Sequence, residues 1–247
     1  MNTLQLLAQD GASIRRRMME VRVQTRRRER EALRGRVAAA LASGAAAHAR
    51  DEEGNTPLMY AVESGEAELV QLLAAADVNT ANAHGLTPLM LAAMLDAPEV
   101  VRALLAAGAD GAARDAEGYS AFMYAAQYAS PGVIRLLHPT APEGEVNAIN
   151  AHGRTLLSLA AMHNASDAVQ LLLDLGAQVN TPGKWGMTPL MCAVHRGVAG
   201  EPVLRTLLAA GAAPRQATTD GDTAYTFAED SDNTLALNLF REYTRHA

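Results

Sequence analysis

The chain has 247 residues, of which 49% are hydrophobic and only 4% aromatic, so a large core must be built mainly from Ala and Leu. Its formal net charge is −6, it has a single cysteine, and it has no apolar run of about 18 residues, which excludes an intrachain disulfide and argues against a membrane span. The opening MNTLQLLAQDG lacks the basic and apolar regions of a secretory signal, so we expect a cytoplasmic protein in a reducing compartment.

Basic residues are concentrated near the N-terminus. Of the 21 basic residues, 20 are Arg, and ten of these lie between Arg15 and Arg36 against three Glu. Ser13 can cap a helix that starts at Ile14 and ends near Gly35. We therefore predict a basic N-terminal helix ahead of an acidic body.

Three interpretations of this Arg-rich segment remain open. In the first, the segment is a solvated helix that covers the apolar side of the first repeat. In the second, it binds an anionic surface such as nucleic acid or anionic lipid, and in the third it binds an acidic protein. No aromatic residue lies between the arginines, which argues against single-stranded nucleic acid. The candidate residues for an anionic surface are Arg15, Arg16, Arg17, Arg26, Arg27 and Arg28.

The remainder of the chain repeats itself. Thr-Pro-Leu-Met begins at Thr56, Thr87 and Thr188, and a glycine precedes this motif or its variants at intervals of 31 to 35 residues. Such a period indicates a solenoid of stacked helix pairs, in which the glycines should line up along one ridge. These glycines are Gly54, Gly85, Gly118, Gly153, Gly186 and Gly221.

Local chemistry predicts two short helices in each unit. The Thr hydroxyl can cap the first helix, Pro suits its first position, and the small Ala residues that follow let neighbouring helices approach. The second helix carries paired Leu or Val residues and closes on Gly-Ala, as at Gly108, Gly176 and Gly211, where Gly suits a left-handed cap.

These features resemble the ankyrin-repeat family, whose unit has a turn with Gly, then Thr-Pro-Leu-His, an Ala pair, a Leu-rich second helix and Gly-Ala-Asp-Val-Asn. The stretches DEEGNTPLMYA, LLAAGADGAARDAEG and LLLDLGAQVNTPG carry the resemblance, which covers about residues 34–230. It implies an all-α, ankyrin-type helical solenoid with short turn and hairpin loops. Met replaces the family's His at Met59, Met90, Met123 and Met191, so we expect these turns to depend more on apolar packing.

The predicted organisation has four parts. Residues 1–33 form the Arg-rich segment and residues 34–50 a half repeat. Five repeats follow at 51–217, and residues 218–247 form a capping repeat, because the end unit of a solenoid needs a wettable outer face.

The resemblance implies a protein-binding module whose concave face holds a partner. In the family, contacts come from the turn residues beside the Gly and from the two residues after the Ala pair. On this chain these positions collect Trp, Tyr and Met, which is typical of an interface, although adjacent turns burying them against each other is the alternative. The predicted partner-binding residues are Leu86, Met94, Leu95, Tyr119, Tyr128, Arg154, Met162, Lys184, Trp185, Met187 and Arg196.

Charge along this face is expected to change from acidic near Glu52, Glu53 and Glu63 to basic near Arg154, Lys184 and Arg196. The chain has no phosphate-binding loop, no Gly-x-Ser-x-Gly and no His-Glu-x-x-His, so we expect no catalysis, no cofactor and no metal site. Cys192 falls on an inner helix, where a buried small hydrophobe is expected rather than a nucleophile.

Two other functions remain open. One is an adaptor or inhibitor that uses the Arg-rich helix on an anionic surface, and the other is a bacterial effector that acts on a host protein. The Ala-rich and Lys-poor composition is compatible with a bacterial source. The sequence does not identify the partner protein.

Overall fold

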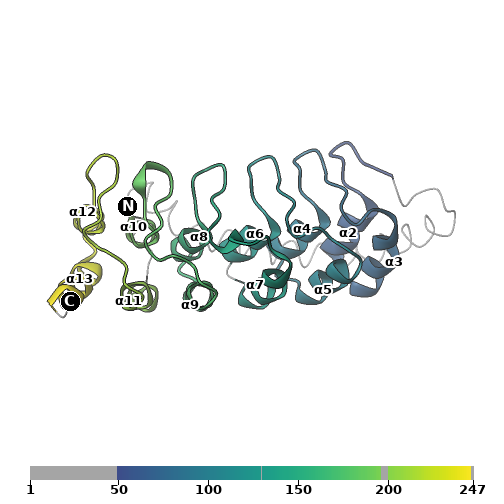
Figure 1. Cartoon of the computed structure of the whole chain (residues 1–247). Coiled ribbons are helices and arrows are strands. Elements are labelled where there is room, and N and C mark those ends of the chain that lie inside the picture. The colour runs from purple at the N-terminus through teal and green to yellow at the C-terminus, as the bar shows by residue number, and fades with distance from the viewer. Residues whose placement is uncertain (1–48, 129, 196–199, 246–247) are drawn as a thin grey trace, which may run out of the picture.

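The computed structural model describes residues 49–128, 130–195 and 200–245. The predicted basic helix with its six candidate arginines, most of the predicted half repeat, and Arg196 lie outside the described residues. Within those ranges the helices come in pairs that stack into a two-layered solenoid, with hairpin loops projecting along one edge (Figure 1). This confirms the predicted all-α solenoid. No helix in these ranges is long and apolar enough to cross a membrane.

The first helices of the pairs form one layer, in which each helix contacts the next one along the chain. These inner helices are α2 (Pro57–Ser64), α4 (Pro88–Met94), α6 (Ala121–Gln127), α8 (Leu156–Met162), α10 (Pro189–His195) and α12 (Ala224–Asp230). The second helices form the other layer in the same manner. These outer helices are α3 (Ala67–Asp77), α5 (Pro98–Ala106), α7 (Pro131–Leu137), α9 (Ser166–Asp174), α11 (Glu201–Ala209) and α13 (Thr234–Arg245).

Three short 3-10 helices lie in the connections: η1 (His138–Thr140), η2 (Glu145–Asn147) and η3 (Lys184–Gly186). The core runs between the two helical layers and is built mostly from Ala, Leu, Val and Met, as the composition indicated. The small Ala residues of the inner helices, such as Ala92 and Ala93, are fully buried, so neighbouring inner helices approach closely.

A side-chain hydroxyl caps the first turn of each inner helix. In each case the oxygen accepts a hydrogen bond from the backbone N–H three residues later, which satisfies one of the donors that the helix leaves unpaired. The capping residues are Thr56, Thr87, Ser120, Thr155, Thr188 and Thr223. The role predicted for Thr in the repeated motif is therefore confirmed.

The Met residues after Thr-Pro-Leu are buried in the core, as expected, but two of them also make a polar contact. The sulfur of Met90 accepts from the backbone N–H of Thr87, and that of Met191 from the N–H of Thr188, both at 3.4 Å. Sulfur is a weak acceptor. The thioether nevertheless completes a capping box, a role that the sequence pattern did not indicate.

The loop before each inner helix projects as a hairpin, called here a finger. The six fingers comprise residues 51–55, 82–86, 115–119, 150–154, 183–187 and 218–222. In each, the first N–H donates to the carbonyl four residues later, as from Asn150 to Arg154 at 3.1 Å. Backbone bonds also tie neighbouring fingers together, as from the N–H of Ala83 to the carbonyl of Glu53 at 2.9 Å.

The finger glycines line up along a single ridge, as predicted. A Cβ atom added at any of the first five would come to 3.0 Å or less from a backbone atom of the next finger. Each of these glycines also has a positive φ, which other residues adopt only with strain. The period of the motif therefore reflects the contact between successive fingers.

Candidate partner-binding site

A carboxylate or amide side chain holds the tip of each of the first four fingers. The Oδ1 atom accepts hydrogen bonds from the backbone N–H groups two and four residues later, at 2.8 to 3.1 Å. This is the geometry by which Asp and Asn stabilise turns. The residues that do so are Asp51, Asn82, Asp115 and Asn150.

The fifth finger is built differently because Gly183 stands at this position. A Cβ atom at Gly183 would lie 2.1 Å from the carbonyl oxygen of Gly153, so the close contact between these two fingers requires glycine. The finger tightens into η3, and Trp185 takes a left-handed backbone conformation with φ 58° and ψ 19°. In the other described fingers the equivalent residue has a negative φ.

Trp185 is both strained and exposed. A left-handed conformation costs a residue with a side chain about 1–2 kcal/mol, and such strain gathers at functional sites. The Trp185 side chain is 64% exposed. The ammonium nitrogen of Lys184 lies 4.5 Å from the centroid of its ring, a cation–π contact that holds the indole at the rim of the fifth finger.

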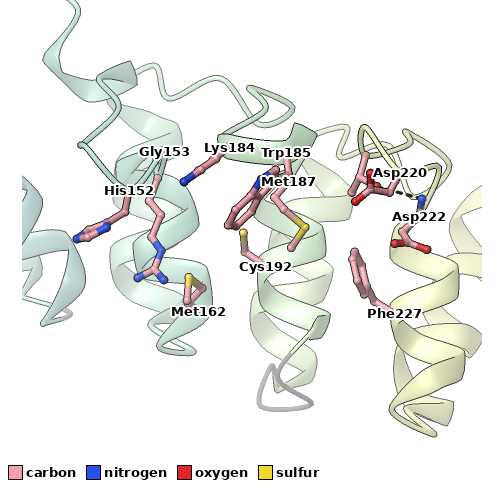
Figure 2. Close-up of a pocket in the computed structure, with 12 residues that line it drawn as sticks. His152, Gly153, Met162, Lys184, Trp185, Met187, Cys192, Asp220, Asp222 and Phe227 are labelled. Carbon is pink, nitrogen blue, oxygen red and sulfur yellow. Dashed lines mark hydrogen bonds between the residues drawn. The ribbon is translucent and has the colours of Figure 1, made fainter.

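A pocket of about 440 Å³ lies beside this finger (Figure 2). Three consecutive fingers contribute equivalent residues to it, one before the finger glycine and one after it. The inner helices contribute Met162, Cys192 and Phe227 below the fingers. The full lining is His152, Gly153, Arg154, Met162, Lys184, Trp185, Met187, Cys192, Thr218, Asp220, Asp222 and Phe227.

Charge is distributed unevenly along this pocket. The fourth and fifth fingers supply the cations Arg154 and Lys184, and the sixth finger supplies the anions Asp220 and Asp222. Trp185 and its apolar neighbours lie between Lys184 and the two aspartates (Figure 2). The arrangement suits a ligand with an apolar centre, a negative group at one end and a positive group at the other.

The structure brings together five of the eleven predicted partner-binding residues: Arg154, Met162, Lys184, Trp185 and Met187 all line the pocket. Leu86, Met94 and Leu95 are half-buried on the second unit, and Tyr128, after α6, is 38% exposed. These four do not line the pocket, so the predicted band is only partly one site.

Tyr119, predicted as a partner-binding residue, is instead buried, because only 5% of it is exposed, which is the alternative given for these positions. Its ring stacks on Tyr124 with centroids 5.0 Å apart and meets the edge of His152 at 6.0 Å. Burial raises the pKa of Tyr119, and the positive charge of Arg154 opposes that rise. Tyr119 therefore supports the pocket wall from behind instead of offering a contact surface.

A hydrogen bond positions His152 on the same wall, since its Nε2 atom lies 3.1 Å from Oε2 of Glu117 on the preceding finger. Both side chains are at least half exposed, so the contact adds little to stability. It does place the imidazole beside Tyr119, which fixes this edge of the pocket.

Several pocket residues were not predicted. Asp220 and Asp222 belong to the last unit, which was interpreted as a cap, yet they hold the positions equivalent to Trp185 and Met187. The predicted charge gradient ran from acidic at the first unit to basic at the fifth, and it therefore omitted the acidic end of the pocket on the sixth finger. Cys192 is half-buried and lines the pocket, not fully buried as expected. Among the side chains in the described ranges, no cluster of three or more His, Cys, Asp or Glu residues could hold a metal ion.

Comparisons with known proteins agree with this architecture. The chain is 33% identical over 154 residues to the B-cell lymphoma 3 protein of Homo sapiens, which covers 59% of this chain and 34% of that protein. It is 30% identical over 152 residues to the transient receptor potential cation channel subfamily A member 1 of Homo sapiens, covering 61% of this chain and 10% of the relative. For the NF-kappa-B inhibitor alpha of Sus scrofa the identity is 35% over 100 residues, with coverage of 38% and 31%.

The chain thus spans about a third or less of the length of these curated relatives. A family model of ankyrin repeats in three copies matches residues 32–115 and 110–183, and a model of a single ankyrin repeat matches residues 185–219. Together these matches cover most of the chain, in phase with the fingers and helix pairs described above, and the chain therefore belongs to the ankyrin-repeat family.

Proposed function

We propose that this chain is a non-enzymatic protein-binding module, and that a partner docks in the pocket between its fourth and sixth fingers. One observation carries the proposal: the strained and 64% exposed Trp185 stands at a pocket whose centre is apolar. The left-handed backbone and the exposed ring of Trp185 cost free energy in the isolated protein, and burial of the ring against a partner would offset that cost. Tryptophan is also enriched among the residues that dominate binding energy at interfaces.

Family membership supports a role in protein–protein interaction, because ankyrin solenoids present an extended concave surface. One relative is named as an inhibitor of NF-kappa-B, a role exerted on another molecule. The single cysteine fits a reducing compartment, so we place the interaction in the cytoplasm.

The test compares three immobilised proteins: the wild type, Trp185→Ala and Leu72→Ala. Leu72 is a fitting control, because it is 68% exposed but lies on the outer helix α3, in the first described pair. Proteins captured from a lysate of the source organism are identified by mass spectrometry, and each candidate is purified and titrated against the three baits. We expect a partner that binds the wild type and Leu72→Ala equally and Trp185→Ala at least tenfold more weakly. Equal binding to all three baits would place the interaction on another surface.

A further inference from the structure

We propose that the pocket recognises a short extended segment of the partner in which an acidic residue and a basic residue flank one apolar anchor. This inference rests on the proposed function and defines the chemistry of the occupant. It uses both charged ends of the pocket, the apolar zone between them, and the spacing of the fingers.

The charged ends select opposite groups. An acidic residue of the partner would meet Arg154 and Lys184, and a basic residue would meet Asp220 and Asp222. Arg154 is half-buried, whereas the other three side chains are exposed. A uniformly acidic segment would meet repulsion from the aspartates, and a uniformly basic one from Arg154 and Lys184, so either is disfavoured.

The same argument counts against two other occupants. A nucleic acid strand carries only negative charge along its backbone, which the two aspartates would repel. The chain's own Arg-rich segment holds ten arginines and three glutamates between Arg15 and Arg36, so most of its length would be repelled by Arg154 and Lys184.

The centre of the pocket selects an apolar side chain. Trp185, Met187 and Cys192 lie between the charged ends, and Phe227 lies beside them on α12 (Figure 2). A volume of about 440 Å³ is within the range of sites that enclose a compact organic group. Met side chains adapt to the shape of their neighbour, so the zone can accept aromatic or aliphatic anchors.

The repeat geometry sets the spacing of the charges. Packed helices lie roughly 8–10 Å apart, so residues one or two units apart along the solenoid are separated by about 10–20 Å. An extended chain covers that distance in about three to six residues. The acidic and basic residues of the partner segment should therefore be about three to six positions apart, with the anchor between them.

The chain carries its own reporters for a test, because Trp185 is its only tryptophan and Cys192 its only cysteine. We would titrate the full chain with synthetic peptides that share one central Phe. Two contain an Asp pair and an Arg pair on opposite sides of the Phe, in the two possible orders. The controls are an all-acidic peptide, an all-basic peptide, and each mixed peptide with Ser in place of Phe. Trp185 fluorescence gives the affinity, and the rate of Cys192 alkylation shows whether the pocket is covered.

We expect at least one mixed peptide to bind at least tenfold more tightly than every control and to slow the alkylation of Cys192. Equal affinity for the all-acidic or the all-basic peptide would overturn the charge rule. Failure of both mixed peptides to bind would overturn the inference as a whole. If a partner protein still depended on Trp185 in that case, the proposed function would stand without this specificity.

Variants of the protein provide the matched control. Asp220→Asn with Asp222→Asn should weaken the better mixed peptide at least tenfold and remove the discrimination against the all-acidic peptide. Glu229→Gln with Asp230→Asn changes the net charge equally, on exposed residues of the same unit that do not line the pocket. The control pair should leave the affinity within about twofold. An equal loss in both double variants would mean that net charge, not the pocket, sets the affinity, and would overturn the inference.

Discussion

Arg114 and Glu145 join the third and fourth units through a salt bridge in which Nη2 lies 2.6 Å from Oε2. The other carboxylate oxygen of Glu145 accepts a hydrogen bond from the hydroxyl of Ser120, also at 2.6 Å. Glu145 is only 4% exposed, so both partners satisfy a charge that has little access to water.

An asparagine forms the corresponding link at three other junctions. Its amide nitrogen donates to the carbonyl of the glycine that ends the next outer helix, and its Oδ1 accepts from a backbone N–H two residues beyond that glycine. These residues are Asn79, Asn147 and Asn180. Ala112 stands at the equivalent position three residues before the third finger and cannot make these bonds. The Glu145 cluster therefore replaces the missing asparagine.

We expect Glu145→Gln to lower the free energy of unfolding by about 1–3 kcal/mol, because the substitution removes a buried charge from two short bonds. The Arg114 side chain is 38% exposed and can be rehydrated, which keeps the loss below that of a fully buried pair. Glu99→Gln is the control, since Glu99 is 74% exposed and lies 4.0 Å from Arg102. Urea denaturation should show less than about 0.5 kcal/mol for this control. Equal effects would show that the Glu145 cluster is not a structural link.

The sequence predicted those parts of the structure that local chemistry repeats in every unit. The Thr-Pro-Leu caps and the Gly-Ala helix ends depend on residues within one unit, and the finger glycines make the same contact with the next finger at every step, so the spacing of these motifs was sufficient. The burial of Tyr119 and the acidic end of the pocket at Asp220 and Asp222 depend on which side chains of neighbouring units touch. A one-dimensional pattern does not contain that information, and the last unit was set aside as a cap.

The left-handed backbone of Trp185 could have been predicted from the residue that begins its finger. Four fingers begin with Asp or Asn, whereas the fifth begins with Gly183 in the stretch TPGKWG. Loss of the side chain that holds the tip predicts a different turn, and a different turn changes the direction of the following side chain.

Truncation to Ala should destabilise the protein much more at Tyr119 than at Tyr128. Tyr119→Ala removes a buried ring from the Tyr124 and His152 contacts, and we expect a loss of about 2–4 kcal/mol in the free energy of unfolding. Tyr128→Ala removes a ring that is 38% exposed, so its cost should stay below about 1 kcal/mol. Chemical denaturation of both variants measures the difference. A Tyr119→Ala protein as stable as the wild type would contradict the buried placement.

Substitutions to Ala at Gly183 and Gly65 distinguish the cost of a steric clash from the cost of backbone strain. Gly183→Ala forces a Cβ against the Gly153 carbonyl, so we expect a loss of about 1–3 kcal/mol together with a changed Trp185 fluorescence spectrum. Gly65 has a φ of 76° but open space around its Cβ position, so Gly65→Ala should cost about 1 kcal/mol and leave the spectrum unchanged. An unchanged Trp185 spectrum in Gly183→Ala would show that this glycine does not shape the fifth finger.

Stability should decline at high pH through Tyr124. Burial, together with the hydrogen bond that its hydroxyl donates to Oδ2 of Asp115 at 2.5 Å, raises the pKa of Tyr124 above its usual value. The folded state therefore favours the neutral phenol, and its contribution is complete below the unfolded pKa of about 10. Above that pH the unfolded tyrosine ionises first, so the free energy of unfolding falls by about 1.4 kcal/mol per pH unit until the folded pKa is reached.

The measurement is urea denaturation between neutral pH and the alkaline range, for the wild type and for Tyr124→Phe. The variant should lose stability less steeply above pH of about 10, because it has one phenol fewer to ionise. Parallel curves for the two proteins would show that Tyr124 titrates alike in the folded and unfolded states.

Trp185 should be dispensable for folding. Trp185→Gly relieves a backbone strain of about 1–2 kcal/mol and loses a cation–π contact that is worth about 0.5–1 kcal/mol at an exposed site. The free energy of unfolding should therefore stay equal or rise by up to about 1.5 kcal/mol, whereas partner binding falls. Trp185→Val puts a β-branched residue into the same conformation and should lower stability by about 1–2 kcal/mol. Thermal and urea unfolding of the two variants distinguishes backbone strain from side-chain packing. If Trp185→Gly lost as much stability as Trp185→Val, the indole would be needed to hold the fifth finger together. That result would contradict the view that Trp185 is kept for a partner.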